Sequence, residues 1–183
     1  MIDRKQAAAA LADIDDIVQR LRQSQLYELA SLAAIWWGVL VFAGNLVTWA
    51  WPFYAKYAWP AVDILGVGGL VAIRLLAPSR AQPAGFDVRI VLVFALFFAF
   101  GNICTNLLGH FGPRELGAFW PIYFMLFYTL AGLWFGYAFV AIGLGITALT
   151  LIGYFTIGAA FPLWMAFVNG GGLILGGLWM RRI

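Results

Sequence analysis

Four long apolar stretches, at 29–55, 58–73, 90–108 and 116–180, constrain this chain more than any other feature of its sequence. A helix that crosses the hydrocarbon core of a bilayer needs about 20 predominantly apolar residues. The first three stretches therefore hold one span each, and the fourth is long enough for three. Composition agrees, because 64% of the residues are hydrophobic and 10% are charged. A soluble domain carries roughly 25% charged residues.

We predict an all-α membrane protein with six transmembrane helices, near 28–50, 59–77, 87–109, 116–136, 138–157 and 161–180. The boundary between the fourth and fifth spans is the least marked, because residues 136–145 carry no charge. No later segment has the composition of a soluble domain. The chain therefore divides into residues 1–26 and a six-helix transmembrane domain at 27–183.

The basic residues predict the orientation, since cytoplasmic loops are enriched in Lys and Arg. With the N-terminus in the cytoplasm, only Lys56 and Arg114 lie outside. The other nine basic residues then lie inside: Arg4, Lys5, Arg20, Arg22, Arg74, Arg80, Arg89, Arg181 and Arg182. An even number of spans also returns the C-terminus to the cytoplasm. The net charge of +3 follows from this topology and does not indicate a nucleic-acid partner.

Residues 1–26 are hydrophilic and lack the apolar core and cleavage site of a signal peptide. We predict an amphipathic cytoplasmic helix, because apolar side chains recur with a 4-3-4-3 spacing at Ala7, Leu11, Ile14, Val18 and Leu21. Two interpretations stay open. The helix lies on the bilayer surface or on the 77–87 loop, or it docks a cytoplasmic protein or a second copy through residues 3–25.

A short repeat places polar residues inside the spans. "GNLVT" at 44–48 and "GNICT" at 101–105 share one pattern, and "WP" or "FP" opens each even-numbered span. Counting back from those prolines finds a polar pair, spaced i and i+3, in every odd-numbered span: Asn45 and Thr48, Asn102 and Thr105, Thr147 and Thr150. The pattern predicts three helical hairpins in parallel repeat.

These pairs predict a polar layer in the outer half of the bilayer. Asn102, Thr105, Asn106 and His110 fall within about 140° on one helical face, and Asp63 lies at a comparable depth. We expect Asn45, Asn102 and Thr147 to face protein, because lipid cannot hydrogen-bond them. Replacing Asn102 by Leu would then cost about 1–3 kcal/mol. Two interpretations compete: hydrogen bonds that hold helices together, or a ligand site that opens outward.

Glycines mark close helix packing at three small-xxx-small pairs, Gly132 with Gly136, Gly172 with Gly176 and Gly68 with Ala72. Asn169 precedes three consecutive glycines, 170–172. That run either loosens the last span and exposes backbone carbonyls or packs tightly against the first or fifth span. We include Asn169 among the candidate ligand-binding residues.

No enzyme signature is present. The single histidine, His110, excludes a bis-histidine haem or a His-rich metal site within one chain, and it has no serine placed to form a catalytic triad. The spans hold no paired carboxylates, and the glycine-rich runs lie in apolar helices and not after strands. The single cysteine, Cys104, cannot form an internal disulfide. We predict no catalytic residues, no cofactor and no metal.

The end of the chain, "ALTLIGYF" followed by "FPLWMAFVNGGGLILGGLWMRR", resembles the C-terminal part of small multi-pass bacterial membrane proteins of unknown function. The resemblance covers about the last third of the chain. It implies a bacterial inner (cell) membrane and transfers no site residues.

Two functions follow from the polar layer. The first is a non-catalytic membrane receptor or regulatory subunit, in which the layer binds a small ligand and the N-terminal helix docks a partner. The second is a small-solute channel or transporter along the same layer. A conduit needs polar groups through its whole depth, and the cytoplasmic halves of spans 1, 3 and 5 have none. The sequence therefore favours the first.

Overall fold

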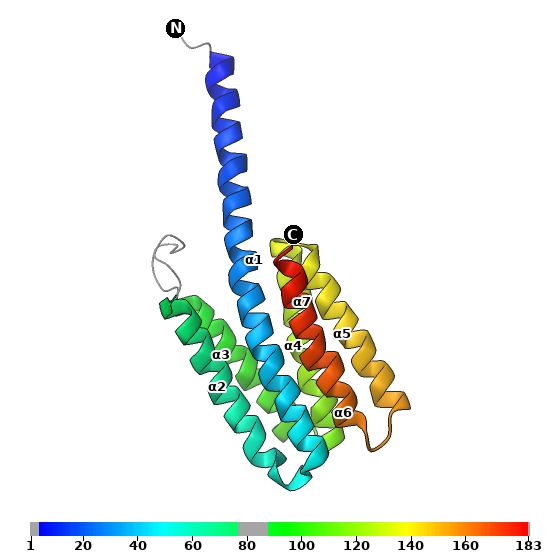
Figure 1. The fold of residues 1–183 in the computed structure, drawn as a ribbon. Helices are drawn as coiled ribbons and strands as arrows, with labels where there is room; N and C mark the ends of the chain where they lie inside the picture. Colours follow the sequence, from blue (N-terminus) through cyan, green and yellow to red (C-terminus); the bar gives the residue numbers. More distant parts are fainter. Residues whose placement is uncertain (1–3, 77–87, 183) are drawn as a thin grey trace.

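The computed structural model describes the backbone of residues 4–76 and 88–182 and the side chains of residues 27–73 and 92–182. Every regular element in this part of the chain is helical, and the helices stand side by side in one bundle (Figure 1). In order they are α1 (Arg4–Ala50), η1 (Pro52–Tyr54), α2 (Ala55–Leu76), α3 (Val88–Asn102), η3 (Ile103–Leu108), α4 (Pro113–Phe135), α5 (Tyr137–Thr156), α6 (Phe161–Met165), η4 (Ala166–Gly171) and α7 (Gly172–Met180).

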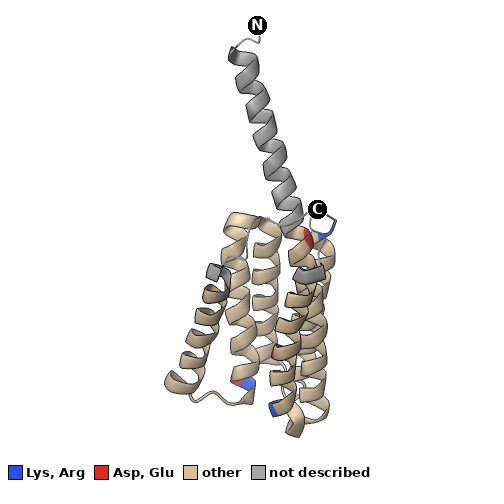
Figure 2. Cartoon of the chain, turned by 90° about the vertical axis from the view of Figure 1, so that its left-hand side faces the viewer, with Lys and Arg blue, Asp and Glu red and all other residues tan. Residues whose placement is uncertain are grey.

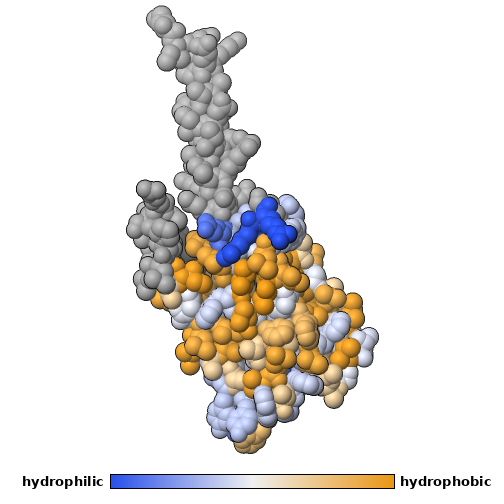
Figure 3. Space-filling view, viewed as in Figure 1, coloured by the Kyte–Doolittle hydropathy of each residue, from blue (hydrophilic) through white to orange (hydrophobic). Residues whose placement is uncertain are grey.

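Five helices are long and apolar enough to cross a membrane: Tyr27–Ala50, Pro52–Ile73, Pro113–Phe135, Tyr137–Thr156 and Phe161–Met180. A sixth apolar helix, Leu92–Leu108, is shorter. Hydrophobic side chains dominate the surface of the bundle (Figure 3), and its described Lys and Arg residues lie at the two ends (Figure 2). The prediction of an all-helical membrane protein is confirmed at this level.

Helix α1 is a single unbroken helix of 47 residues. At 1.5 Å per residue it is about 70 Å long, roughly twice the thickness of a bilayer's hydrocarbon core. It therefore runs through the bundle and continues past one end, the end at which α7 also finishes (Figure 1). The predicted N-terminal helix thus continues into the first apolar helix without interruption. Its side chains up to residue 26 and the 77–87 loop lie outside the described residues.

The first apolar segment packs closely against the last. A Cβ added at Gly38 would lie 2.8 Å from the carbonyl oxygen of Gly170, and one at Gly170 would lie 2.6 Å from the Cα of Phe42. The Ser31 hydroxyl donates to the Gly177 carbonyl at 2.7 Å and accepts a hydrogen bond from Arg181 at 3.0 Å. Small residues therefore bring these two backbones into direct contact, as is common between helices in membranes.

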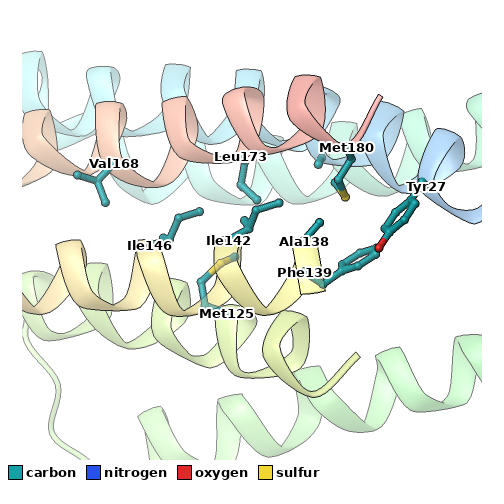
Figure 4. Packing of buried hydrophobic residues seen from close by; sticks show 10 residues of the cluster. Tyr27, Met125, Ala138, Phe139, Ile142, Ile146, Val168, Leu173 and Met180 are labelled. Atoms are coloured by element: carbon teal, nitrogen blue, oxygen red, sulfur yellow. The ribbon is translucent and has the colours of Figure 1, made fainter. Parts of the chain in front are cut away.

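The main core lies between α7, α5, α4 and α1 (Figure 4). Leu173 of α7 lies by Ile142 and Ile146 of α5, Met180 lies by Ala138, and Met125 of α4 closes the far side (Figure 4). Glycines set this spacing, because a Cβ at Gly172 would meet Ile146 and one at Gly176 would meet Ile142. The predicted close packing of Gly172 and Gly176 is confirmed.

The prediction that Gly68 of α2 marks a close helix contact was wrong. A Cβ at Gly68 would meet nothing within 4 Å. Gly66 and Gly69 instead leave room for Trp37 and Trp36 of α1, whose rings occupy the space that their side chains would take. Two large indoles need two open positions on the contacting face, and the sequence pattern alone does not identify that face.

Three hydrogen bonds from Trp or Tyr side chains to backbone carbonyls of a neighbouring helix share one geometry. Trp36 Nε1 donates to the Leu65 carbonyl at 3.1 Å, Tyr123 Oη to Phe97 at 3.1 Å, and Trp164 Nε1 to Leu149 at 3.0 Å. In each case a glycine stands four residues after the acceptor, at positions 69, 101 and 153, and the aromatic side chain lies against it. These contacts join α1 to α2, α4 to α3, and α6 to α5.

Candidate functional site

The structure divides the predicted polar residues between the interior and the surface of the bundle. Asn45, Thr150 and Asn169 are buried, with 5%, 0% and 6% of their surface exposed. Thr105 is also buried, at 5%. Thr48 and Thr147 are half-buried, whereas four side chains are exposed: Asp63, Asn102, Asn106 and His110. His110 is exposed as expected.

The expectation that Asn45, Asn102 and Thr147 all face protein was therefore wrong for Asn102. Helix α3 turns its aromatic side chains toward α4, and Phe97 stacks on Tyr123 with ring centroids 4.0 Å apart. Gly101 and Thr105 lie on that aromatic face, while Asn102 and Asn106 point away from the bundle. Packing of the rings decides the rotation of this helix, so the three-residue layer does not form within the chain.

Most polar side chains in the helices are satisfied by their own backbone. Five of the six threonines donate to the carbonyl four residues earlier, namely residues 48, 105, 129, 147 and 156. Three of the four asparagines do the same through Nδ2, namely residues 45, 102 and 106. Such local bonds give each of these side chains one hydrogen-bond partner within its own helix.

Thr150 and Asn169 depart from this rule. Thr150 Oγ1 and Asn169 Oδ1 are buried and have no hydrogen-bond partner among the described residues. An unsatisfied buried polar atom costs about 1–3 kcal/mol, and native interiors contain few of them. These two oxygens are therefore the feature of the interior that most requires an explanation.

The packing register of α5 against α7 places Thr150 and Asn169 at similar depth on neighbouring elements. Ile142 meets Gly176 and Ile146 meets Gly172, so the next turn of α5 brings Thr150 level with residues 168 and 169 of η4. The contact of the Trp164 ring with Gly153 continues the same register beyond this level. The chain thus places two unsatisfied oxygens in neighbouring helices.

Helix α1 completes the layer. A Cβ at Gly170 would touch the backbone of Phe42, and Asn45 lies one turn further along α1, with Nδ2 bonded to Val41 at 2.9 Å. We call the three buried residues Asn45, Thr150 and Asn169 the interior polar layer. The predicted layer of Asn45, Asn102 and Thr147 differs from it in two members. Asn102 of α3 is absent, Thr150 takes the place of Thr147 on α5, and Asn169 is added.

Both polar stretches that the sequence emphasised adopt π-helix, at Ile103–Leu108 and Ala166–Gly171. Segments of π-helix are rare and often accompany functional sites. Of the three glycines after Asn169, Gly170 packs on Phe42 and Gly172 on Ile146, while a Cβ at Gly171 would meet nothing within 4 Å. The predicted tight packing is confirmed for two of the three glycines.

Arg114 was not identified by sequence reasoning as a structural residue. Its guanidinium donates to the carbonyls of Gly158, Tyr154 and Ile157 at the end of α5, the first at 2.9 Å. The Tyr154 and Phe161 rings lie 5.2 and 5.0 Å from its Cζ. A cation is favourable beside the unpaired carbonyls at a helix C-terminus. The available signal was that Arg114 is one of only two basic residues predicted on the outer side.

Among the described side chains, no group of three or more His, Cys, Asp or Glu is placed to hold a metal ion. Comparison with protein-family models, with curated proteins and with solved structures finds no match to this chain. Functional inference therefore depends on the residues themselves.

Proposed function

We propose that this protein is a non-catalytic multi-pass membrane receptor or regulatory subunit. In this proposal the interior polar layer binds a small polar ligand, and α1 carries the bound state to a cytoplasmic partner. The observation that carries the proposal is the pair of unsatisfied buried oxygens on Thr150 and Asn169. A guest that supplies hydrogen bonds to both would remove the cost of burying them.

The continuity of α1 supports the relay. Asn45 and the residues from Arg4 onward belong to the same helix, so a shift of α1 at the interior polar layer also moves its extension. The contact with Gly170 couples α1 directly to the π-helical segment that holds Asn169. A guest that alters this segment would act on α1 through backbone contact.

The transport alternative receives less support. A conduit would continue from the interior polar layer toward the end of the bundle where α7 finishes. The buried side chains in that direction, including Ile142, Ile146 and Leu173, are apolar and packed together (Figure 4). A closed site fits this arrangement better than a path, because solute flow needs polar groups along its length.

The topology of the proposal is six spans arranged as three hairpins, with both termini in the cytoplasm of a bacterial cell. The three hydrogen bonds that Trp36, Tyr123 and Trp164 donate support the hairpins. Each of these bonds joins the two helices of one predicted hairpin. A reporter fused after Ile183 tests the orientation. Activity in the cytoplasm is expected, and periplasmic activity would exclude this topology.

Native mass spectrometry of the purified protein, together with thermal unfolding, tests the ligand site. We expect a retained small guest in the wild type and in Thr147→Val, whose hydroxyl already bonds to Gly143 at 2.7 Å. Thr150→Val and Asn169→Leu should lose the guest, and Thr150→Val should lower the unfolding temperature. If the oxygens are simply unsatisfied, Thr150→Val would raise it and no sample would carry a guest.

Flux measurements then separate the two functions. Once the guest is known by mass, wild-type protein in liposomes should bind it without moving it across the membrane. Transport that Asn169→Leu abolishes would establish the alternative and reject the receptor.

A further inference from the structure

The exposed face of α3 and η3 carries polar side chains where a membrane helix normally presents only apolar ones. Asn102 and Asn106 are exposed, although they lie inside the apolar helix Leu92–Leu108. Asn106 Nδ2 donates to the backbone and side-chain oxygens of Asn102 at 3.1 and 3.2 Å. The two amides therefore form a short ladder on the outside of the bundle.

Lipid is a poor environment for this ladder. Each amide keeps part of its hydrogen-bonding capacity after the bonds within the helix, because an Asn side chain has two donors and an acceptor with two lone pairs. Hydrocarbon offers no partner for the remainder. Polar side chains in transmembrane segments are therefore expected to face protein or water, and the described residues place no protein against this face.

The neighbours of the ladder have the spacing of a helix–helix contact. Leu92, Ala95, Ala99, Asn102 and Asn106 follow intervals of 3, 4, 3 and 4 residues, and all five are exposed. A 3.5-residue repeat places them in one line along a helix. Alanines let two backbones approach closely, and asparagines hydrogen-bond across such contacts.

This line is separate from the face that attaches α3 to the chain. Phe94, Phe97 and Phe98 hold α3 to α4 through ring contacts, with Phe97 and Phe124 centroids 5.5 Å apart. The line from Leu92 to Asn106 occupies a neighbouring face of the helix, and its side chains are exposed. Helix α3 can therefore contact a further helix without releasing α4.

We propose that this line, which we call the α3 seam, is the surface at which a second copy of the chain packs. Two copies with the same topology run their α3 helices in parallel, so alanine meets alanine and asparagine meets asparagine at equal depth. An amide is its own complement, since it both donates and accepts. The seam carries no charge, so identical copies meet no electrostatic repulsion there.

The proposal is independent of the ligand site, because the seam and the interior polar layer share no residue. A symmetric pair joined at α3 would leave α1 and its extension free on each copy. Asparagines hydrogen-bond across such contacts, and loss of both should weaken association by about tenfold or more.

Dimerisation of the full-length chain in liposomes tests the seam. Fluorescence energy transfer between labelled copies, measured over a series of protein-to-lipid ratios, gives the dissociation constant. The double variant Asn102→Leu with Asn106→Leu should raise that constant about tenfold or more, while Leu107→Ala, an exposed substitution in the same helix, should not. Unchanged association of the double variant, or a monomeric wild type, would reject the seam.

Cysteine cross-linking locates the contact. With Cys104 replaced by Ser, Ala99→Cys should form a disulfide-linked dimer under mild oxidation. Phe100→Cys, one residue away on a different face, should stay monomeric. Equal cross-linking of both, or none with Ala99→Cys, would show that the copies do not meet here. Thermal unfolding of each variant confirms that it is folded.

Discussion

The bundle holds its helices together in two different ways. Helix α1 meets α6, η4 and α7 backbone to backbone, with glycines at 38, 170 and 177 at the contact. Helix α3 meets α4 through rings, such as Phe97 on Tyr123 and Phe98 on Trp120. Direct backbone contact leaves no tolerance for an added atom, whereas a layer of rings keeps the backbones apart and can adjust. The first contact fixes the interior polar layer, and the second leaves one face of α3 open.

The largest effect is expected where backbones touch. Gly170→Ala would place a Cβ 2.6 Å from the Cα of Phe42, and overpacking of this kind costs about 1–3 kcal/mol. We expect a value near the upper limit, because backbone atoms cannot rotate aside. Denaturant unfolding followed by circular dichroism measures it. The matched control is Gly171→Ala, whose Cβ would meet nothing within 4 Å. Equal losses in both variants would contradict the comparison.

A smaller effect is expected in the ring layer. Tyr123→Phe keeps the ring stacked on Phe97 and removes only the hydroxyl that donates to the Phe97 carbonyl at 3.1 Å. The free energy of unfolding should fall by about 1 kcal/mol. Tyr57→Phe, on an exposed side chain, serves as control in the same unfolding experiment. A loss above that of Gly170→Ala would mean that the ring layer is the more rigid contact.

The smallest effect is expected at Asn102. Its side chain is exposed, and its donor bond goes to Phe98 of the same helix, so Asn102→Leu should change the stability of the monomer by less than about 0.5 kcal/mol. The measurement requires detergent at a dilution where copies are separate. This expectation replaces the loss of about 1–3 kcal/mol that a buried Asn102 would have caused. A loss of that size would place the side chain in the interior.

The positions of the apolar helices were predictable from the sequence, because their lengths follow from runs of apolar residues and their ends from Pro and Gly. The last apolar helix begins at Phe161 and ends at Met180, as predicted, and the chain turns at Gly136 between α4 and α5. These features depend on neighbouring residues only. The number of spans stays a prediction.

The rotation of each helix was not predictable in the same way. Helix α3 carries a polar face and an aromatic face, and the sequence does not weigh hydrogen bonding of Asn102 against stacking of Phe97 on a residue of another helix. The same limit applies to α2, where Gly66 and Gly69, and not Gly68, receive the indoles of α1. Thr105, Thr150 and Asn169 are buried, as expected for polar residues that face protein. Each lies on a helical face that also carries the residues packed against a neighbouring helix.

The turn at Gly136 has a consequence for how two helices of the bundle can move relative to each other. This single residue connects α4 to α5, and its φ of 129° is one that a residue with a side chain rarely adopts. One residue spans at most about 3.6 Å, so the end of α4 and the start of α5 lie side by side in the folded chain. Any motion between these two helices is therefore a pivot about Gly136, with the larger displacement at their far ends.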